Sequence, residues 1–359
     1  MKIKRLLITA LTVALFPATI EAQEISGNDQ SSGMFSSEEV SFTNPADGAV
    51  LSGTLLLPQG VEKPVVVLLV TGSGLQNRDE EIFKLKPFKD IAEYLASRGI
   101  ASLRYDDRGF GKSTGSIDGA TTDTFLSDAE AGVEFLKNYR SEPGNPAATF
   151  SKIGVAGHSE GGTIAFLLAA DKKVDFIISL AGGAIQGKEA VMTQNYNAFK
   201  MQGVPEDQYG PVLDAIEEVF DKLIQSPEDE PFSKTMERIA KESSSPEIAR
   251  TLAMQLGNDS NGKWYKRFLA LDPSDAISRI TCPVMAVNGT LDFQVDCKEN
   301  LDNLKKRLPA SPKNLIKSYE GINHLLVPCK TGYPTEYPSL EGHVSEELLK
   351  EIADWILGL

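Results

Sequence analysis

The chain of 359 residues is short of histidine, cysteine and positive charge, and each shortage narrows what it can do. Its three histidines leave few candidates for a catalytic base. Its three cysteines allow one disulfide and one free thiol. The 36 lysines and arginines are outnumbered by 50 aspartates and glutamates, and the net charge of −14 disfavours binding to nucleic acid or to anionic lipid.

Long hydrophobic runs are missing as well. The apolar stretch at residues 6–16 is shorter than the about 20 residues that a bilayer-spanning helix needs. Basic residues precede it and a plausible cleavage site follows at Ala22, so residues 1–22 are predicted to be a secretory signal peptide, with an uncleaved anchor as the alternative. We therefore expect an exported protein, periplasmic or secreted, without membrane attachment after cleavage. The polar residues 23–37 are predicted to form a flexible lead-in.

Seven apolar runs of strand length alternate with amphipathic stretches of helix length. The first run alternates in polarity and is typical of an antiparallel strand, whereas the second is apolar throughout, as in a strand buried on both faces. This order predicts an α/β fold with a mostly parallel, doubly wound sheet. The expected strands are residues 49–58, 65–70, 100–105, 152–157, 174–180, 283–289 and 314–320. The expected helices are residues 87–98, 123–139 and 161–170, and a C-terminal helix with Ser345 as its N-cap.

Residues 184–275 interrupt this alternation, because they contain no convincing strand and have helical character broken by prolines. We interpret them as a helical lid inserted over one end of the sheet, with an independent second domain as the alternative. The core is then formed by residues 38–183 and 276–359.

A single serine stands among glycines directly after the fourth expected strand. The segment Gly157-His158-Ser159-Glu160-Gly161 fits the pattern G-x-S-x-G, which between a strand and a helix forms a sharp turn that exposes the serine. The glycines leave room for the backbone to fold back. A phosphate-binding turn is the alternative, but no lysine follows the glycines. Ser159 is therefore the predicted nucleophile.

A serine nucleophile needs a base, and the base needs an acid that fixes its tautomer. His158 lies inside the turn and is expected to pack beside the strand end, and His343 is expected to be exposed. His324 follows the last expected strand, at the sheet edge where Ser159 lies, and is therefore the predicted base.

The predicted acid is Asp292, because it leaves the sixth expected strand after a glycine-containing turn. Asp296, four residues farther on, is the alternative. The sequence order of Ser159, Asp292 and His324 matches the Ser…Asp…His order known for this strand-to-helix serine motif.

Backbone N–H groups are the expected donors to the oxyanion. One is the amide of Glu160, because a helix N-terminus has unpaired donors and a positive dipole end. The other is expected in the loop after residues 65–70, where either Ser73 or Gly74 is a candidate and a plain turn is the alternative.

From about residue 40 to the C-terminus, the chain resembles the α/β-hydrolase superfamily, in particular bacterial esterases of the serine aminopeptidase-like branch. The motifs that carry the resemblance are TGSGLQNRDE, YDDRGFGKSTG, GVAGHSEGG, CPVMAVNGTLDFQV and INHLLV. The resemblance implies a helical lid, hydrolysis of small acyl esters, and no need for a metal or cofactor. Thr71 is a departure, because many relatives have histidine there; the change spares the triad but alters the polarity of the pocket.

Two charged segments flank the predicted oxyanion loop. In residues 105–113, Asp107 and Arg108 are expected to form an ion pair and turn that support this loop, rather than a clamp for a substrate carboxylate. Residues 78–81 are expected to form a solvated loop rather than a metal site.

The cysteines are assigned from their positions. Cys297 follows the predicted acid and Cys329 follows the predicted base, so a disulfide between them is one possibility. Cys282 is expected to be a free thiol in the core.

These features together predict an exported serine hydrolase that acts on a small-molecule ester through an acyl-enzyme. An aminopeptidase or amidase with the same triad is the first alternative, for which the lid acids Glu217, Glu218 and Asp221 are candidates to bind an α-amine. A non-catalytic binding protein on the same scaffold is the second. Trp264, Tyr265 and Phe268 are candidates to line the pocket, with ordinary core packing as the alternative, and the oligomeric state is not predicted.

Overall fold

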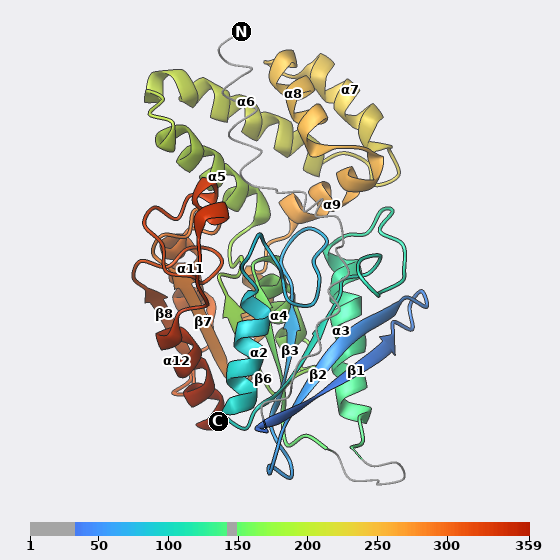
Figure 1. Cartoon of the computed structure of the whole chain (residues 1–359). Helices are drawn as coiled ribbons and strands as arrows, with labels where there is room; N and C mark the ends of the chain where they lie inside the picture. The colour runs from blue at the N-terminus through green and yellow to red at the C-terminus, as the bar shows by residue number, and fades with distance from the viewer. Residues whose placement is uncertain (1–32, 142–148) are drawn as a thin grey trace.

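The computed structural model describes residues 33–141 and 149–359 of the chain. Its centre is one sheet of eight strands in the order β1-β2-β4-β3-β5-β6-β7-β8 (Figure 1). From β4 to β8 in this order neighbouring strands are parallel, and β1 and β2 form an antiparallel edge, so the mostly parallel sheet predicted from the sequence is confirmed. The strands are β1 (Phe35–Thr43), β2 (Val50–Pro58), β3 (Val66–Val70), β4 (Ala101–Tyr105), β5 (Ile153–His158), β6 (Phe176–Leu180), β7 (Val284–Gly289) and β8 (Leu315–Tyr319).

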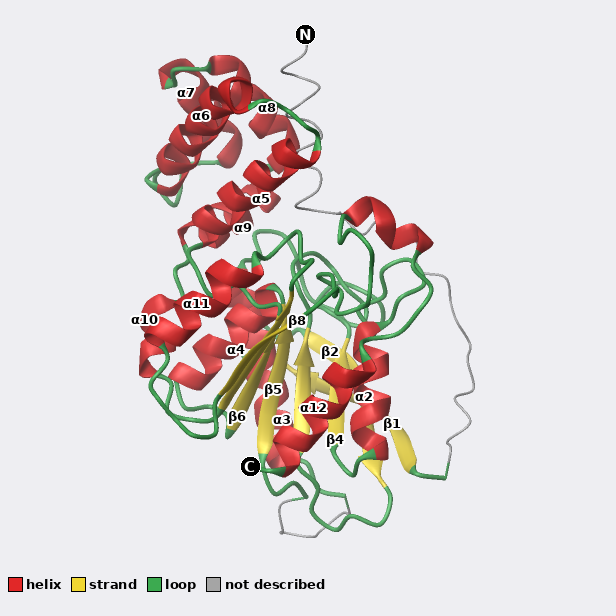
Figure 2. Ribbon diagram, turned by 90° about the vertical axis from the view of Figure 1, so that its left-hand side faces the viewer, coloured by secondary structure: helices red, strands yellow, loops and turns green. Residues whose placement is uncertain are grey.

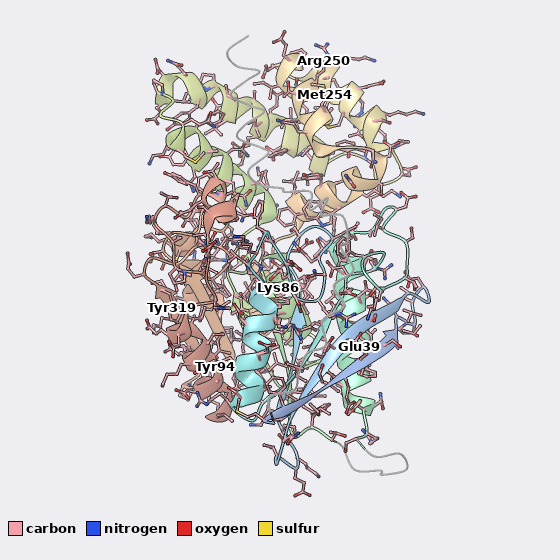
Figure 3. The ribbon with its side chains drawn as sticks, in the orientation of Figure 1. Glu39, Lys86, Tyr94, Arg250, Met254 and Tyr319 are labelled. Carbon is pink, nitrogen blue, oxygen red and sulfur yellow. The ribbon has the colours of Figure 1, made fainter. Side chains whose placement is uncertain are left out.

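Strand β1 is the strand that the sequence pattern did not predict. It pairs along its whole length with β2, and its first three residues belong to the predicted flexible lead-in. Most of its side chains are exposed, so it lacks the apolar run that marks the central strands. Its Glu39 projects at the edge of the sheet (Figure 3), where it pairs with Arg78 and Lys112. The predicted signal peptide, residues 1–22, lies outside the described residues.

Helices cover both faces of the sheet (Figure 2). Helices α2 and α12 pack on one face, and α3, α4, α10 and α11 pack on the other, because β3 to β7 present apolar side chains to both sides. Ser345 accepts the backbone N–H of Leu348 and caps α12, as expected. These helices are α2 (Pro87–Ser97), α3 (Thr122–Asn138), α4 (Glu160–Ala170), α10 (Ser274–Arg279), α11 (Cys297–Arg307) and α12 (Glu346–Leu357).

The chain between β6 and α10 forms a helical insertion. Figure 1 shows its helices stacked beyond one end of the sheet. They enclose an apolar cluster of their own, which includes Ile216, Phe220 and Leu252. No helix in the described ranges is long and apolar enough to cross a membrane. The insertion consists of α5 (Gly187–Met201), α6 (Glu206–Ile224), α7 (Phe232–Glu242), α8 (Pro246–Leu256) and α9 (Asp259–Ala270).

Helix α9 connects the insertion to the core. Arg267 binds both carboxylate oxygens of Asp123 on α3, at 2.6 and 2.8 Å. The outer end of the insertion is α8, where Arg250 and the largely exposed Met254 lie far from the sheet (Figure 3). Helix α9 is therefore tied to α3 of the core.

Candidate active site

Ser159 lies between β5 and α4 in a strained backbone conformation. Its φ of 52° and ψ of −118° fall in a region that residues with a side chain rarely adopt. The turn closes because its neighbours are glycines: a Cβ on Gly157 would lie 1.9 Å from the carbonyl oxygen of Gly161, and one on Gly161 would lie 2.2 Å from that of Val70. The glycine spacing read from the sequence thus places Ser159 at the carboxyl edge of the sheet.

Asp292 and His324 follow β7 and β8, and their side chains are joined. His324 Nδ1 lies 2.8 Å from Asp292 Oδ2, and both side chains are buried. The other oxygen of Asp292 accepts the backbone N–H groups of Gln294 and Val295 at 2.8 and 2.9 Å. Because a carboxylate only accepts, Nδ1 carries the hydrogen and Nε2 is left as the basic nitrogen of the ring.

The alternative acid, Asp296, does not bind His324 and instead caps a helix. Its side chain accepts the backbone N–H of Glu299 at 2.8 Å and caps the N-terminus of α11. His343 is exposed, as expected, and pairs with Asp90 at 2.9 Å. Among the candidates, the geometry therefore joins His324 to Asp292.

The segments that carry Ser159 and His324 lie side by side. The ring of His158, the residue before Ser159, packs against the ring of His324 with 4.6 Å between centroids. Within the described residues, His324 bonds to Asp292 and to His158, and no hydrogen bond joins it to the Ser159 hydroxyl. Contacts of this kind often tighten only when substrate binds.

The loop after β3 passes directly over Ser159. A Cβ on Gly72 would lie 3.0 Å from Ser159 Cβ, so a side chain at this position would crowd the serine. The Gly72 amide donates to Glu80 Oε1 at 2.9 Å, whereas no hydrogen bond from the Ser73 or Gly74 amide is found within the described residues. The predicted donors therefore lie in the loop that covers the serine.

Glu160 also contributes its side chain, a role that the G-x-S-x-G pattern does not indicate. Its buried carboxylate accepts hydrogen bonds from Thr122 Oγ1 at 2.5 Å, Ser73 Oγ at 2.9 Å and Trp264 Nε1 at 3.0 Å. Burial raises the pKa of Glu160, although all three hydrogen bonds lower it. One carboxylate thus joins the loop after β3, the start of α3 and helix α9 of the insertion.

Trp264 was expected only as a candidate to line the pocket. The structure instead gives its indole N–H a specific acceptor next to Ser159, and stacks its ring on Phe268 with 4.9 Å between centroids. No local pattern could reveal the pair, because 104 positions separate Trp264 from Glu160.

Asp107 supports the oxyanion loop, as expected. It accepts the hydroxyl of Thr71 and the backbone N–H of Gln76, both at 2.7 Å. Burial raises the pKa of Asp107 well above its usual range, although these two hydrogen bonds lower it. Because the Thr71 hydroxyl is occupied in this way, the departure from histidine at this position supplies an anchor for the loop.

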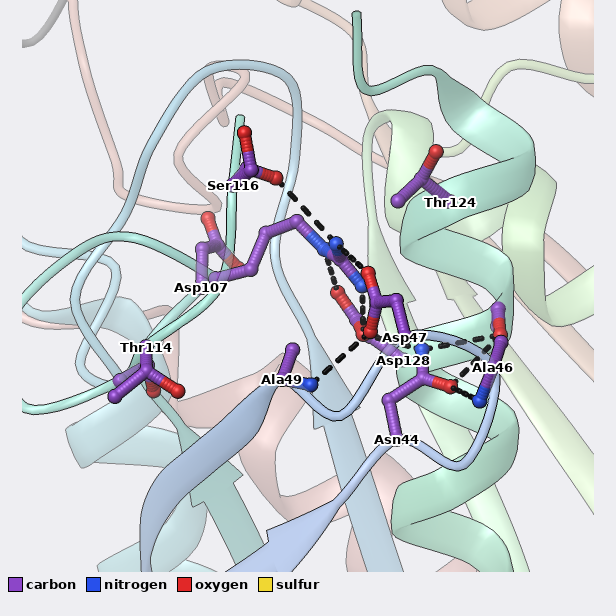
Figure 4. Close-up of polar contacts among 12 residues, drawn as sticks. Asn44, Ala46, Asp47, Ala49, Asp107, Thr114, Ser116, Thr124 and Asp128 are labelled. Carbon is purple, nitrogen blue, oxygen red and sulfur yellow. Dashed lines mark hydrogen bonds and ion pairs between the residues drawn. The ribbon is translucent and has the colours of Figure 1, made fainter. Parts of the chain in front are cut away.

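Arg108 does not form the expected pair with Asp107. Its guanidinium lies 2.6 and 2.7 Å from the carboxylates of Asp47 and Asp128. Figure 4 labels these two acids, which lie close together. Asp128 also accepts the side-chain amide of Asn44 at 2.7 Å. Arg108 therefore ties the turn after β4 to α3 and to the turn between β1 and β2.

The expectation of a solvated loop at residues 78–81 was wrong. Arg78 binds the buried Asp106 at 2.9 Å, and Asp79 pairs with Arg104. Glu80 is only 1% exposed and accepts a hydrogen bond from His158 Nδ1 at 2.8 Å. The loop folds inward because its charges have buried partners on β4 and in the turn around Ser159. Within the described residues, no group of three or more His, Cys, Asp or Glu side chains is placed to hold a metal ion.

The possible disulfide between Cys297 and Cys329 is not formed, and all three cysteines are free. The sulfur of Cys297 lies 3.9 Å from the carbonyl oxygen of Asn288, and that of Cys329 lies 3.8 Å from that of Gly321. Each thiol thus contacts the backbone at or just beyond the end of the strand that precedes it, β7 for Cys297 and β8 for Cys329. Burial raises the pKa of Cys297 to about 11.

Comparison with known proteins identifies the family. Residues 84–328 match the family model described as serine aminopeptidase, S33. Esterase EstD of Thermotoga maritima is 27% identical over 308 residues, which are 86% of this chain and 65% of that protein, so the chain spans about two thirds of the length of this relative.

Two solved structures share the fold. The esterase Pf2001 of Pyrococcus furiosus has a TM-score of 0.55 at 17% identity, with 94% of this chain and 97% of that chain covered. The ferulic acid complex of Est1E from Butyrivibrio proteoclasticus has a TM-score of 0.54 at 18% identity, with 89% of this chain and 98% of that chain covered. The predicted fold is thereby confirmed, and the chain belongs to the serine aminopeptidase S33 family of the α/β-hydrolase superfamily.

Proposed function

We propose that the protein is an exported serine hydrolase that cleaves small carboxylic esters through an acyl-enzyme on Ser159. The observation that carries the proposal is the buried hydrogen bond of 2.8 Å between His324 and Asp292, in the loop beside the serine turn. It fixes the ring with Nε2 free, as a general base requires. The similarity to an esterase from Thermotoga maritima supports an ester as substrate.

In the proposed reaction, His324 Nε2 takes the proton of the Ser159 hydroxyl as its oxygen attacks the ester carbonyl. The negative charge that develops on the carbonyl oxygen is held by the amide of Glu160 and by that of Ser73 or Gly74. His324 then gives the proton to the departing alcohol, and a water molecule that it activates releases the acid. Asp292 stays ionised throughout and stabilises the imidazolium.

The acids of the insertion favour an ester over a peptide with a free amino terminus. An aminopeptidase needs an unpaired carboxylate to bind the α-amine, but Lys188 already pairs with Glu217 and Asp221, at 3.2 and 2.7 Å. Glu218 binds Lys222 and the backbone and hydroxyl of Ser244, which lower its pKa to about 2. These three acids are therefore engaged in salt bridges on the insertion.

The test is hydrolysis of p-nitrophenyl esters of increasing chain length, beside aminoacyl p-nitroanilides. We expect Ser159→Ala to reduce ester turnover on the order of 10⁴-fold or more and to abolish labelling by a fluorophosphonate probe, while circular dichroism is unchanged. Ser278→Ala, at an exposed serine on α10, is the control and should behave as wild type. Retained turnover in a folded Ser159→Ala variant would refute the mechanism. Faster cleavage of the anilides would favour the peptidase, and an unlabelled wild-type chain would favour a binding protein.

A further inference from the structure

His158 is held between two hydrogen-bond acceptors. Its Nδ1 lies 2.8 Å from a carboxylate oxygen of Glu80, and its Nε2 lies 2.8 Å from the backbone carbonyl oxygen of His324. A carbonyl oxygen has no hydrogen to give, so Nε2 must carry one. A neutral imidazole has a single N–H, and the contact to Glu80 therefore requires a second hydrogen between Nδ1 and the carboxylate.

The surroundings of Glu80 place this second hydrogen on the ring. Glu80 Oε1 already accepts the Gly72 amide at 2.9 Å, which favours the negative charge on that oxygen. In water an imidazole holds a proton more tightly than a carboxylic acid does, with ordinary pKa values of about 6.5 and 4.3. Burial lowers the pKa of His158, but the Glu80 carboxylate, the His324 carbonyl and Asp292 outweigh burial, and the pKa stands above its ordinary value.

Glu80 has two unfavourable features, a strained backbone and an unpaired buried oxygen. Its φ of 52° is left-handed, which is rare for a residue with a side chain, and its Oε2 is buried with no hydrogen-bond partner in the part of the chain that the structure describes. Strain and an unpaired buried oxygen persist when the contacts around them require the position. Here those contacts are the Gly72 amide and the His158 ring.

The pair joins the three segments that meet at the proposed active site. Glu80 holds the loop that covers Ser159, His158 is the residue before Ser159, and the His158 ring holds the main chain of His324. We propose that His158 is an imidazolium, paired with the Glu80 carboxylate, and that it acts as a positioning residue that fixes the base and the oxyanion loop around Ser159. The role of the pair rests on the proposed function; its protonation state does not.

This arrangement also balances the charges of the proposed reaction. The ring that faces His158 is that of His324, which becomes positive when it accepts the serine proton. The carboxylates facing the two rings are Glu80 and Asp292, one for each imidazolium. Without Glu80, two positive rings 4.6 Å apart would share one carboxylate.

Nitrogen-15 NMR of the full chain tests the protonation state directly, because the chain has three histidines. At about pH 7, near neutral and above the ordinary histidine pKa, we expect one histidine with hydrogens on both ring nitrogens. It should remain in His343→Asn, which removes the exposed ring, and disappear in His158→Gln. A neutral His158 ring at this pH overturns the proposal whatever the kinetics show.

Glu80→Gln tests the positioning role. The amide keeps the size and an oxygen for Gly72 but removes the charge that holds the second hydrogen on the ring. We expect kcat for p-nitrophenyl acetate to fall about 10- to 100-fold with KM nearly unchanged, since small displacements of catalytic groups have effects of this order. Glu81→Gln, at the neighbouring residue, which pairs with Lys86 instead, is the matched control and should keep the wild-type kcat.

The outcomes separate this inference from the proposed function. If wild type reacts with a fluorophosphonate probe and Glu80→Gln keeps the wild-type kcat, the positioning role is wrong and the hydrolase proposal stands. If wild type neither reacts with the probe nor cleaves esters, the hydrolase proposal fails, and with it the positioning role. If Glu80→Gln does not fold, the comparison of His158→Gln with His158→Ala tests the positioning role instead. The glutamine side chain is long enough to donate to the His324 carbonyl, so His158→Gln should retain a higher kcat than His158→Ala. Equal kcat values in the two variants would overturn the positioning role.

Discussion

The carboxyl edge of the sheet and the helical insertion differ in the burial of their ion pairs. At the sheet edge, Arg108 and Asp128 form an ion pair in which each side chain is 2% exposed. On the insertion, Arg238 pairs with Glu230 with side chains that are 37% and 24% exposed, and Lys188 pairs with two acids that are about half exposed. The ion pair at the sheet edge is thus buried away from water, whereas the ion pairs of the insertion are in contact with water.

This difference in burial indicates which interactions stabilise each region. A buried ion pair is expensive to desolvate, so its geometry must be kept once it is formed, and it fixes the loops that it joins. An exposed pair contributes little, with a median of about 0–1 kcal/mol. The insertion is instead held by its apolar cluster, while the loops around Ser159 are held by paired charges. Buried ion pairs are thus found near the proposed active site, and partly exposed ones on the insertion.

The largest effect is expected from Asp128→Asn. The change leaves the buried guanidinium of Arg108 with Asp47 as its remaining carboxylate partner, and it weakens the bond from Asn44. Removal of one partner of a buried pair typically costs about 3–5 kcal/mol of unfolding free energy. Urea unfolding followed by circular dichroism measures the loss.

Asp302→Asn is the control for this change, because it breaks the exposed pair between Asp302 and Lys298. Its unfolding free energy should stay within about 0.5 kcal/mol of wild type. Equal losses in Asp128→Asn and Asp302→Asn would show that the sheet edge and the surface do not differ in the way proposed.

The parts of the site that depend on residues close together in the chain could be predicted from the sequence. The turn around Ser159 depends on the glycines beside it, and the positions of Asp292 and His324 depend on the strands that precede them. The pattern also predicted seven of the eight strands, because they are apolar, and missed β1 because its side chains are mostly exposed.

The contacts between distant segments could not be predicted in this way. Glu80 and His158 are 78 positions apart, and an acidic loop residue has the same local pattern whether it faces water or a buried ring. The same holds for the cysteines, whose positions in neighbouring loops allowed a disulfide that the structure does not form. Local sequence determines where a chain turns, and side-chain packing determines which partners meet.

An intermediate effect is expected from Trp264→Phe, at the point where the two regions meet. Phenylalanine keeps the ring that stacks on Phe268 but removes the N–H that binds Glu160 at 3.0 Å. Loss of a hydrogen bond to a buried carboxylate should cost about 1.5–3 kcal/mol. Because the pair joins α9 to the residue after Ser159, we also expect KM for p-nitrophenyl esters to change several-fold.

The second tryptophan of the chain is the matched control for this variant. Trp355 donates its N–H to the Lys313 carbonyl at 2.8 Å, on the far side of the core. Trp355→Phe should leave KM unchanged, and it also leaves Trp264 as the single tryptophan whose fluorescence reports the contact. A KM in Trp264→Phe equal to that in Trp355→Phe would show that α9 does not influence the site.

The smallest effect is expected from Lys188→Gln on the insertion. The variant breaks the pairs with Glu217 and Asp221, and because all three side chains are partly exposed, the unfolding free energy should change by less than about 0.5 kcal/mol. The variant also releases two carboxylates that would be needed to bind an α-amine. If the preference for esters depends on the pairing of these acids, cleavage of aminoacyl p-nitroanilides should increase while ester turnover stays constant. If neither activity changes, the acids lie too far from Ser159 to select the substrate, and the selectivity must come from the loop after β3 and from α9.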